Sequence, residues 1–260
     1  MLRSTPGSIR TATDDDLPLI LTWLKEQQSQ DEEDTFLCNW NLTERAHEEG
    51  DLLVYIEAGS NAPVAYFWGS LNDTSSILEV KASHRRHGIG AHFVEHLIGL
   101  SHANNEPLLH IECAPESSVA FWTRMGFEVY SNRRLQWFGT QILPMPRELP
   151  KDGMPIEVSI KFLDERSHYG DAAPISVHAP RAVQMPDGLI HLDRRIAEFC
   201  PSNFNTGREL FIEITVGGQA ASTFVDKCKY SSSEAVGVEA CKNGYAIERI
   251  CPAAFDQQLP

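Results

Sequence analysis

The pattern of apolar and polar residues changes its period several times in the first half of the chain. Residues 17–24 place apolar side chains three and four positions apart, which predicts a helix capped by the aspartates at 14–16. Residues 89–102 show similar spacing and predict an amphipathic helix. Two apolar runs, at 52–57 and 64–68, flank a turn containing glycine and proline, which predicts a hairpin.

Further strands and helices follow from the same patterns. Strands are expected at residues 8–13, 77–81, 108–113, 127–130 and 134–138, and helices in the region that ends near residue 50 and at 116–125. The predicted order is therefore β α α β β β α β α β β, which places this half of the chain in the α/β (α+β) class.

A proline-rich stretch follows this half. Residues 143–155 contain four prolines and a glycine, which indicates a linker because proline fixes φ and lacks a backbone donor. We therefore expect two domains, residues 1–148 and residues 149–260. Apolar and polar residues alternate at 156–162 and 210–216, so the second domain is predicted to be β-rich.

Two local patterns refine the second domain. Gly217 and Gly218 favour a tight hairpin into a strand at 223–225. The spacing of Leu192, Ile196 and Phe199 predicts one short helix. Nothing in this half indicates a function.

The charge of the chain narrows the classes of partner. The formal net charge is -14, and residues 1–150 hold 11 Lys and Arg against 21 Asp and Glu. Such a surface repels phosphate backbones, so we expect no nucleic-acid partner. There is no secretory signal or membrane-spanning run, and the six cysteines form no C-x-x-C pair. We expect a cytoplasmic protein with reduced thiols and no membrane partner.

The segment with the clearest chemistry joins the strand at 77–81 to the helix at 89–102. It reads Val80-Lys81-Ala82-Ser83-His84-Arg85-Arg86-His87-Gly88-Ile89-Gly90-Ala91. Backbone N–H groups at a helix start bind anions, and glycines let a pyrophosphate approach the main chain. Arg85 and Arg86 add positive charge to an otherwise acidic half.

This loop resembles the R/Q-x-x-G-x-G/A loop by which the GNAT N-acetyltransferase superfamily holds the pyrophosphate of coenzyme A. A second block, Ser117 to Phe127, is similar to the family's helix and "GF" strand start. The resemblance covers about residues 8–140 and implies a mixed central sheet flanked by helices, with acetyl-CoA as co-substrate. The coenzyme-binding residues it implies are Val80, Arg85, Arg86, His87, Gly88, Ile89, Gly90, Ala91, Ser118, Phe121 and Trp122.

The resemblance also implies a mechanism in which an amine attacks the thioester directly in a ternary complex, with a backbone N–H near Val80 polarising the carbonyl. Glu79, between two apolar neighbours on the strand, is our candidate for the base that deprotonates the amine. Asp73 and the pair His110 and Glu112 are alternatives.

The acid that protonates the leaving thiolate is less clear. Trp122 stands where the family often has a tyrosine, and an indole N–H cannot fill that role. Tyr130, Ser118 and Cys113 are unranked substitutes, and the coenzyme thiol is a tolerable leaving group unaided, since thiol pKa values lie near about 8.5.

The remaining expectations concern ligands and partners. His84, His87, His92 and His96 lack the spacing of a metal site, so no metal is expected. In the resembled family the acidic run at 31–34 would border the acceptor mouth, where it would attract a cationic amine on a small molecule or a protein. A non-catalytic acyl-CoA sensor or a partner-recruiting module is the alternative, and homodimerisation is left open.

Overall fold

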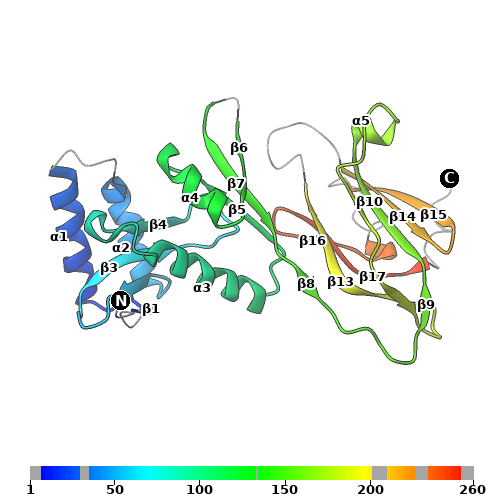
Figure 1. The fold of residues 1–260 in the computed structure, drawn as a ribbon, viewed down its shortest axis with the longest axis horizontal. Helices are drawn as coiled ribbons and strands as arrows, with labels where there is room; N and C mark the ends of the chain where they lie inside the picture. The colour runs from blue at the N-terminus through cyan, green and yellow to red at the C-terminus, as the bar shows by residue number, and fades with distance from the viewer. Residues whose placement is uncertain (1–6, 30–34, 133, 201–209, 226–233, 253–260) are drawn as a thin grey trace. The chain divides into compact units, whose positions relative to one another are not determined.

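The fold was obtained as a computed structural model, which describes residues 7–29, 35–132, 134–200, 210–225 and 234–252 (Figure 1). The chain divides into two compact units. The first comprises Met1–Asn104 and His110–Gln141, and the second comprises Asn105–Leu109 and Ile142–Pro260. We retain the separation into residues 1–148 and 149–260 as a proposal for where independent domains meet.

Up to residue 142 the strands and helices follow one another in the predicted order. The strands are β1 (Ser8–Thr11), β2 (Leu53–Ile56), β3 (Pro63–Trp68), β4 (Ile77–Val80), β5 (Leu108–Glu112), β6 (Glu128–Ser131) and β7 (Trp137–Ile142). The helices are α1 (Asp16–Ser29), α2 (Trp40–Glu48), α3 (Ile89–Ala103) and α4 (Val119–Arg124), with 3₁₀ turns η1 (Phe36–Asn39), η2 (Ala82–His84) and η3 (Glu116–Ser118). The predicted α/β class is confirmed.

Strand alternation determines which helix each side chain of the first sheet meets. The sheet has the order β1-β2-β3-β4, and all its pairs are antiparallel. On one face Tyr66 packs against Trp23 of α1, with ring centroids 6.0 Å apart. On the other face Phe67 packs against Phe93 of α3, at 6.3 Å. Because Glu79 pairs with Tyr66 across the strands, its side chain lies on the α1 face.

The start of α1 is fixed by a buried carboxylate. Asp16 is 2% exposed and accepts hydrogen bonds from both Arg10 amino groups, at 2.6 and 3.0 Å, and from the N–H and hydroxyl of Thr13. Burial alone would raise the pKa of Asp16, but these hydrogen bonds and the Arg10 charge outweigh it and lower the pKa. The ionised carboxylate therefore ties β1 to α1.

We expect Asp16→Asn to destabilise the protein by about 1–3 kcal/mol at neutral pH, a range that allows for screening of the half-exposed Arg10. A lowered folded-state pKa gives stability above the unfolded value of about 3.9, and that stability is lost as the pH falls through the folded value. Urea unfolding over this pH range tests it, with the exposed neighbour substitution Asp15→Asn as control. Equal loss in both variants would contradict the tether.

The second unit is built from two antiparallel sheets. Its elements are β8 (Met145–Pro146), β9 (Met154–Ile156), β10 (Val158–Asp164), α5 (Glu165–His168), β11 (Ser176–His178), β12 (Ala182–Gln184), β13 (Ile190–Phe199), β14 (Leu210–Val216), β15 (Gln219–Val225), β16 (Val238–Cys241) and β17 (Gly244–Ile250). One sheet has the order β11-β10-β14-β15, and the other β16-β17-β13-β12-β9 with β8 beside β13. Buried side chains of both sheets, such as Phe162 and Ile247, share one core, which confirms a β-rich second half.

Two local predictions in this unit had opposite outcomes. Gly217 and Gly218 form the two-residue turn between β14 and β15, as expected, and both have positive φ. The short helix predicted from Leu192, Ile196 and Phe199 is wrong, because these residues lie in β13. A spacing of four also fits strand alternation, and the register of β13 against β17 shifts between residues 191 and 196.

The last strand of the first unit is also displaced from its prediction. It was expected at 134–138, but β7 begins at Trp137. The Asn132 carboxamide accepts hydrogen bonds from the N–H groups of Arg134 and Gln136, and Leu135 has a φ of 61°. These contacts make a turn from residues that the apolar pattern assigned to a strand. Among the described helices, none is long and apolar enough to cross a membrane.

Candidate active site

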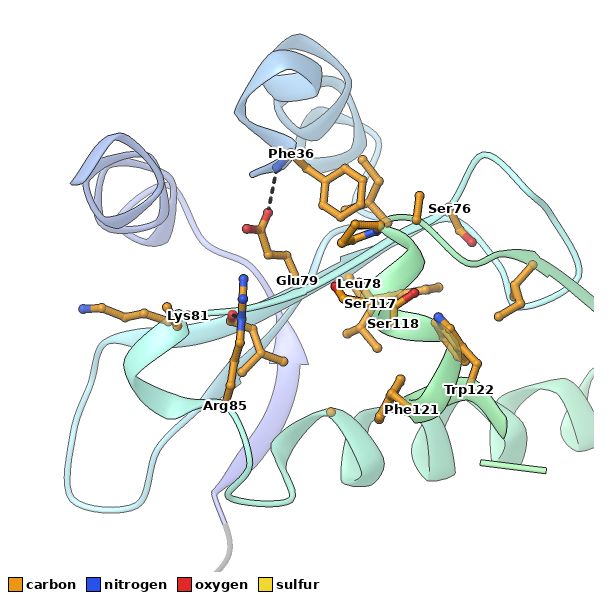
Figure 2. A pocket seen from close by; sticks show the side chains of 18 of the residues that line it. Phe36, Ser76, Leu78, Glu79, Lys81, Arg85, Ser117, Ser118, Phe121 and Trp122 are labelled. Carbon is orange, nitrogen blue, oxygen red and sulfur yellow. Dashed lines mark hydrogen bonds between the residues drawn. The ribbon is translucent and has the colours of Figure 1, made fainter. Parts of the chain in front are cut away.

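A large cavity in the first unit lies at the end of β4, between the helices that flank it (Figure 2). Its volume is about 1710 Å³. The residues predicted for the site that line it are Glu79, Val80, Arg85, Arg86, Gly88, Gly90, Ala91, Ser118, Phe121 and Trp122. His87 and Ile89 are outside the lining, since Ile89 is buried in the core and His87 faces solvent.

The basic loop bends sharply just before α3. Gly88 has a φ of 85° and immediately precedes the helix, and Arg86 also has a positive φ of 66°. A Cβ atom on Gly88 would meet no atom within 4 Å, so the space above the loop is open. The first N–H groups of α3 have no carbonyl of their own helix to bind, and they lie beside this space. The arrangement fits an anion such as a pyrophosphate.

Gly90 differs from Gly88, because protein atoms surround it closely. A Cβ atom at this position would lie 3.3 Å from the Phe121 ring and 3.7 Å from Val80 Cγ2. The helix start, β4 and α4 thus converge on a place where only a hydrogen atom fits without displacement. Glycine at position 90 therefore lets the Phe121 ring and Val80 pack closely against the start of α3.

Arg85 lies against the end of the strand. Its Nε donates a hydrogen bond to the Val80 carbonyl oxygen at 3.0 Å, and Figure 2 shows its side chain on the β4 side of the cavity. The guanidinium charge therefore lies between the loop and Glu79. Arg86, by contrast, is exposed.

Glu79 is a buried carboxylate whose two oxygens differ in their hydrogen bonds. Its exposed fraction is 4%, and its Oε2 accepts hydrogen bonds from the Phe36 N–H at 3.2 Å and the Tyr66 hydroxyl at 3.1 Å (Figure 2). Its Oε1 has no hydrogen-bond partner among the described residues. Burial raises the pKa of Glu79, although the two hydrogen bonds and the Arg85 charge offset part of that effect. A raised pKa makes this carboxylate a better proton acceptor than an exposed glutamate.

The structure separates the alternative bases. Glu112 lines the cavity, whereas Asp73 and His110 are not among its lining residues. Asp73 accepts hydrogen bonds from Ser75, and burial lowers the pKa of His110 to about 4. Glu79 and Glu112 are thus the two candidates that reach the cavity, and Glu79 is the more buried.

The candidates for the acid also differ in position. Trp122 is 7% exposed and packs edge-on against Phe121 and Phe127, with centroids 5.0 and 5.3 Å away. Ser118 lines the cavity, and its hydroxyl has no hydrogen-bond partner among the described residues. Tyr130 and Cys113 are not lining residues, and burial raises the pKa of Cys113 to about 11. Ser118 is therefore the substitute placed to reach a ligand.

The opposite end of the cavity was not anticipated from the sequence. Its lining residues on α1, η1, α2 and β3 are Trp23, Glu26, Gln27, Phe36, Asn39, Leu42, Phe67 and Trp68. Gln27 joins α1 to the basic loop, because its Oε1 accepts a hydrogen bond from the Ala82 N–H at 2.7 Å. Helical spacing could have extended the buried face of α1 to Trp23 and Gln27, but no local pattern marks Phe36 or Trp68. The acidic run expected at the acceptor mouth, residues 31–34, lies outside the described residues.

No group of three or more His, Cys, Asp or Glu side chains in the described part of the chain has the arrangement of a metal site. His84 lies 3.5 Å from Glu57, and His92 packs against Tyr55.

Comparison with known proteins supplies the last observation on this site. Residues 15–127 match the family described as acetyltransferase (GNAT) family. No curated protein matches the sequence. The matched region contains every lining residue of the cavity.

Several solved acetyltransferase structures are similar. A PaiA N-acetyltransferase from Thermoplasma acidophilum, in complex with coenzyme A, is 13% identical with a TM-score of 0.41, over 54% of this chain and 100% of that chain. A ribosomal-protein-alanine N-acetyltransferase from Brucella melitensis is 23% identical with a TM-score of 0.39, over 52% and 99%. A GNAT acetyltransferase from Listeria monocytogenes is 11% identical with a TM-score of 0.43, over 53% and 95%.

Proposed function

Because residues 15–127 form an acetyltransferase domain of the GNAT family, we propose that the protein transfers an acetyl group from acetyl-CoA to a primary amine. In this reaction the amine nitrogen forms a bond to the acetyl carbonyl carbon, and the carbon–sulfur bond breaks. The sulfur of coenzyme A leaves with the bonding electrons and receives a proton, while the nitrogen loses one. The single observation that carries the proposal is a buried carboxylate, Glu79, one residue from the strand end beside an anion-binding helix start.

The loop and the first turn of α3 would hold the coenzyme. The N–H groups after Gly88 bind the pyrophosphate, and the exposed Arg86 guanidinium adds charge attraction. Val80 and Phe121 line the cavity beside this loop and would contact the extended arm of the coenzyme. The Val80 main chain lies beside the thioester, and its N–H is the donor for the carbonyl oxygen.

Glu79, whose side chain lies on the face of β4 that meets α1, would act as the base. Its free Oε1 is the proton acceptor, while Tyr66 and the Phe36 N–H hold Oε2 in place. The ionised form is the active one, so activity is lost as the pH falls through the raised pKa of Glu79. A positioned general base contributes about 10²–10⁴-fold to such a reaction.

The test is release of coenzyme A thiol, followed with a thiol reagent, when the full chain meets acetyl-CoA and a mixture of primary amines. We expect release that requires both the protein and an amine. Thiol release that is the same with and without amines would indicate hydrolysis and would oppose transfer to nitrogen. Omission of the protein and replacement by a heat-unfolded sample serve as controls.

The second candidate function is a non-catalytic acyl-CoA sensor. It is favoured by Trp122, because a buried indole packed between Phe121 and Phe127 cannot protonate the leaving thiolate. A sensor would bind acetyl-CoA without amine-dependent thiol release.

A further inference from the structure

The end of the cavity away from the basic loop has a distinct chemistry. Its aromatic and aliphatic lining residues on the α1 face of the sheet and on the helices are Trp23, Phe36, Leu42 and Trp68. Phe36 and Trp68 are only partly buried, and Leu42 remains 41% exposed. Apolar surface left open beside a candidate base is surface that a substrate would cover.

The charges around Glu79 are mixed, because the Arg85 guanidinium lies close enough to lower the pKa of this carboxylate. The lining residues from α1, η1, α2 and β3 include one ionisable side chain, the exposed carboxylate of Glu26, and Glu79 lies on the adjacent strand. The cationic lining residues Lys81, Arg85 and Arg86 belong to the loop region, and Arg124 belongs to α4. A cationic amine is therefore attracted to Glu79 and Glu26, and the apolar lining residues favour an uncharged group behind the amine, because a second charge would lose its hydration there.

Phe36 joins these two features at one point. Its N–H donates to the Glu79 carboxylate at 3.2 Å, and Figure 2 shows its ring extending from there over the cavity. An amine nitrogen that reaches Glu79 Oε1 thus brings the group that carries it alongside the Phe36 ring. The chain between the amine nitrogen and the apolar group must be short, because the residue that carries the ring also donates its backbone N–H to the Glu79 carboxylate.

We propose that the acceptor is a small primary amine carried on a short chain by an uncharged aromatic or similarly bulky apolar group. This inference rests on the proposed function and specifies its second substrate. Phe36, Leu42 and Trp68 determine specificity, and Glu79 receives the amine.

The experiment compares kcat/KM for four acceptors at saturating acetyl-CoA: 2-phenylethylamine, ethanolamine, phenylalanine and 1,4-diaminobutane. The first pair differs in the ring, and phenylalanine adds only a carboxylate to phenylethylamine. Burial of a phenyl ring predicts a preference of at least roughly tenfold for phenylethylamine over ethanolamine. We expect phenylalanine and 1,4-diaminobutane to be poorer than phenylethylamine by a similar factor.

Leu42→Ser removes apolar surface from the rim without touching the buried core. We expect it to lower kcat/KM for phenylethylamine by roughly three- to tenfold and to leave the KM for acetyl-CoA unchanged. The matched control is Leu100→Ser, a leucine of similar exposure (42%) on α3 that does not line the cavity. Equal losses in the two variants would overturn the assignment of Leu42.

The outcomes separate the inference from the function on which it rests. Faster acetylation of ethanolamine or 1,4-diaminobutane than of phenylethylamine would overturn the inference while confirming transfer to amines. The same holds if a peptide with an apolar first residue, offered in competition, is strongly preferred over every small amine. Amine-independent thiol release, or none with any amine, would instead contradict the proposed function.

Discussion

Replacing Gly88 with glutamate is expected to reduce the affinity for acetyl-CoA by about two orders of magnitude or more, because a like charge at a binding site costs several kcal/mol. The new carboxylate would extend into the open space above the loop, where no protein atom lies within 4 Å of the Cβ position. It would thus occupy the place proposed for the pyrophosphate. The backbone of the new glutamate would also have to adopt the φ of 85°, which favours glycine. Titration calorimetry with acetyl-CoA measures the effect.

Two controls separate charge from backbone strain. Gly59→Glu places the same residue at a glycine with nearly the same φ (82°) and equally open surroundings, but outside the cavity lining. It should bind acetyl-CoA like the parent protein. Gly88→Ala keeps the strain without the charge and should lose far less affinity than Gly88→Glu. Equal affinity of Gly88→Glu and the parent protein would remove the loop from the binding site.

Glu79→Gln is expected to lower kcat by about 100-fold or more, since it removes a positioned general base. The amide keeps an oxygen that can accept from the Phe36 N–H and the Tyr66 hydroxyl, so the fold around β4 should persist. Affinity for acetyl-CoA should change little, because the side chain lies on the α1 face of the strand. Glu95→Gln, an exposed carboxylate on α3, is the matched control and should leave kcat intact.

The pH profile gives a second readout of the same variant. Burial raises the pKa of Glu79, and the base must be ionised to work, so kcat of the parent protein should rise with pH through that raised value. The ionisation of the amine adds its own limb, which is common to both proteins. The acidic limb should therefore be present in the parent and absent in Glu79→Gln. A reduced kcat with an unchanged profile would indicate a structural role for Glu79.

The loop that we propose for the coenzyme could be located from the sequence because its determinants are local. The end of a strand, a basic glycine loop and a helix start lie within twelve consecutive residues, Val80 to Ala91. Glycine at position 88 permits the positive φ that the loop adopts there. Glu79 was proposed from its place between two apolar neighbours on this strand, whereas the face on which its side chain lies came from the structure. His87 and Ile89 were included because they lie inside the motif, but a helix start turns successive residues to different sides.

The part of the cavity that we propose for the acceptor, around Phe36, Leu42 and Trp68, could not be predicted from the sequence. It forms only when separate elements meet. Phe36 has no periodic neighbours, and its role depends on a hydrogen bond to a residue 43 positions away. Trp68 and Leu42 come from a strand and a helix whose apolar patterns predict a core rather than a rim. The error at Leu192 and Ile196 has the related cause that a spacing of four fits both a helix and a strand.

The most direct test of acetyl transfer uses acetyl-CoA labelled in the acetyl group with ¹³C. The full chain is incubated with it and phenylethylamine, and the amine is analysed by mass spectrometry while free thiol is counted in the same sample. The account predicts labelled N-acetyl product in one-to-one ratio with thiol released, and at least a hundredfold less of both with Glu79→Gln. Saturable acetyl-CoA binding with no labelled product from phenylethylamine or from any amine in a broad mixture would contradict it.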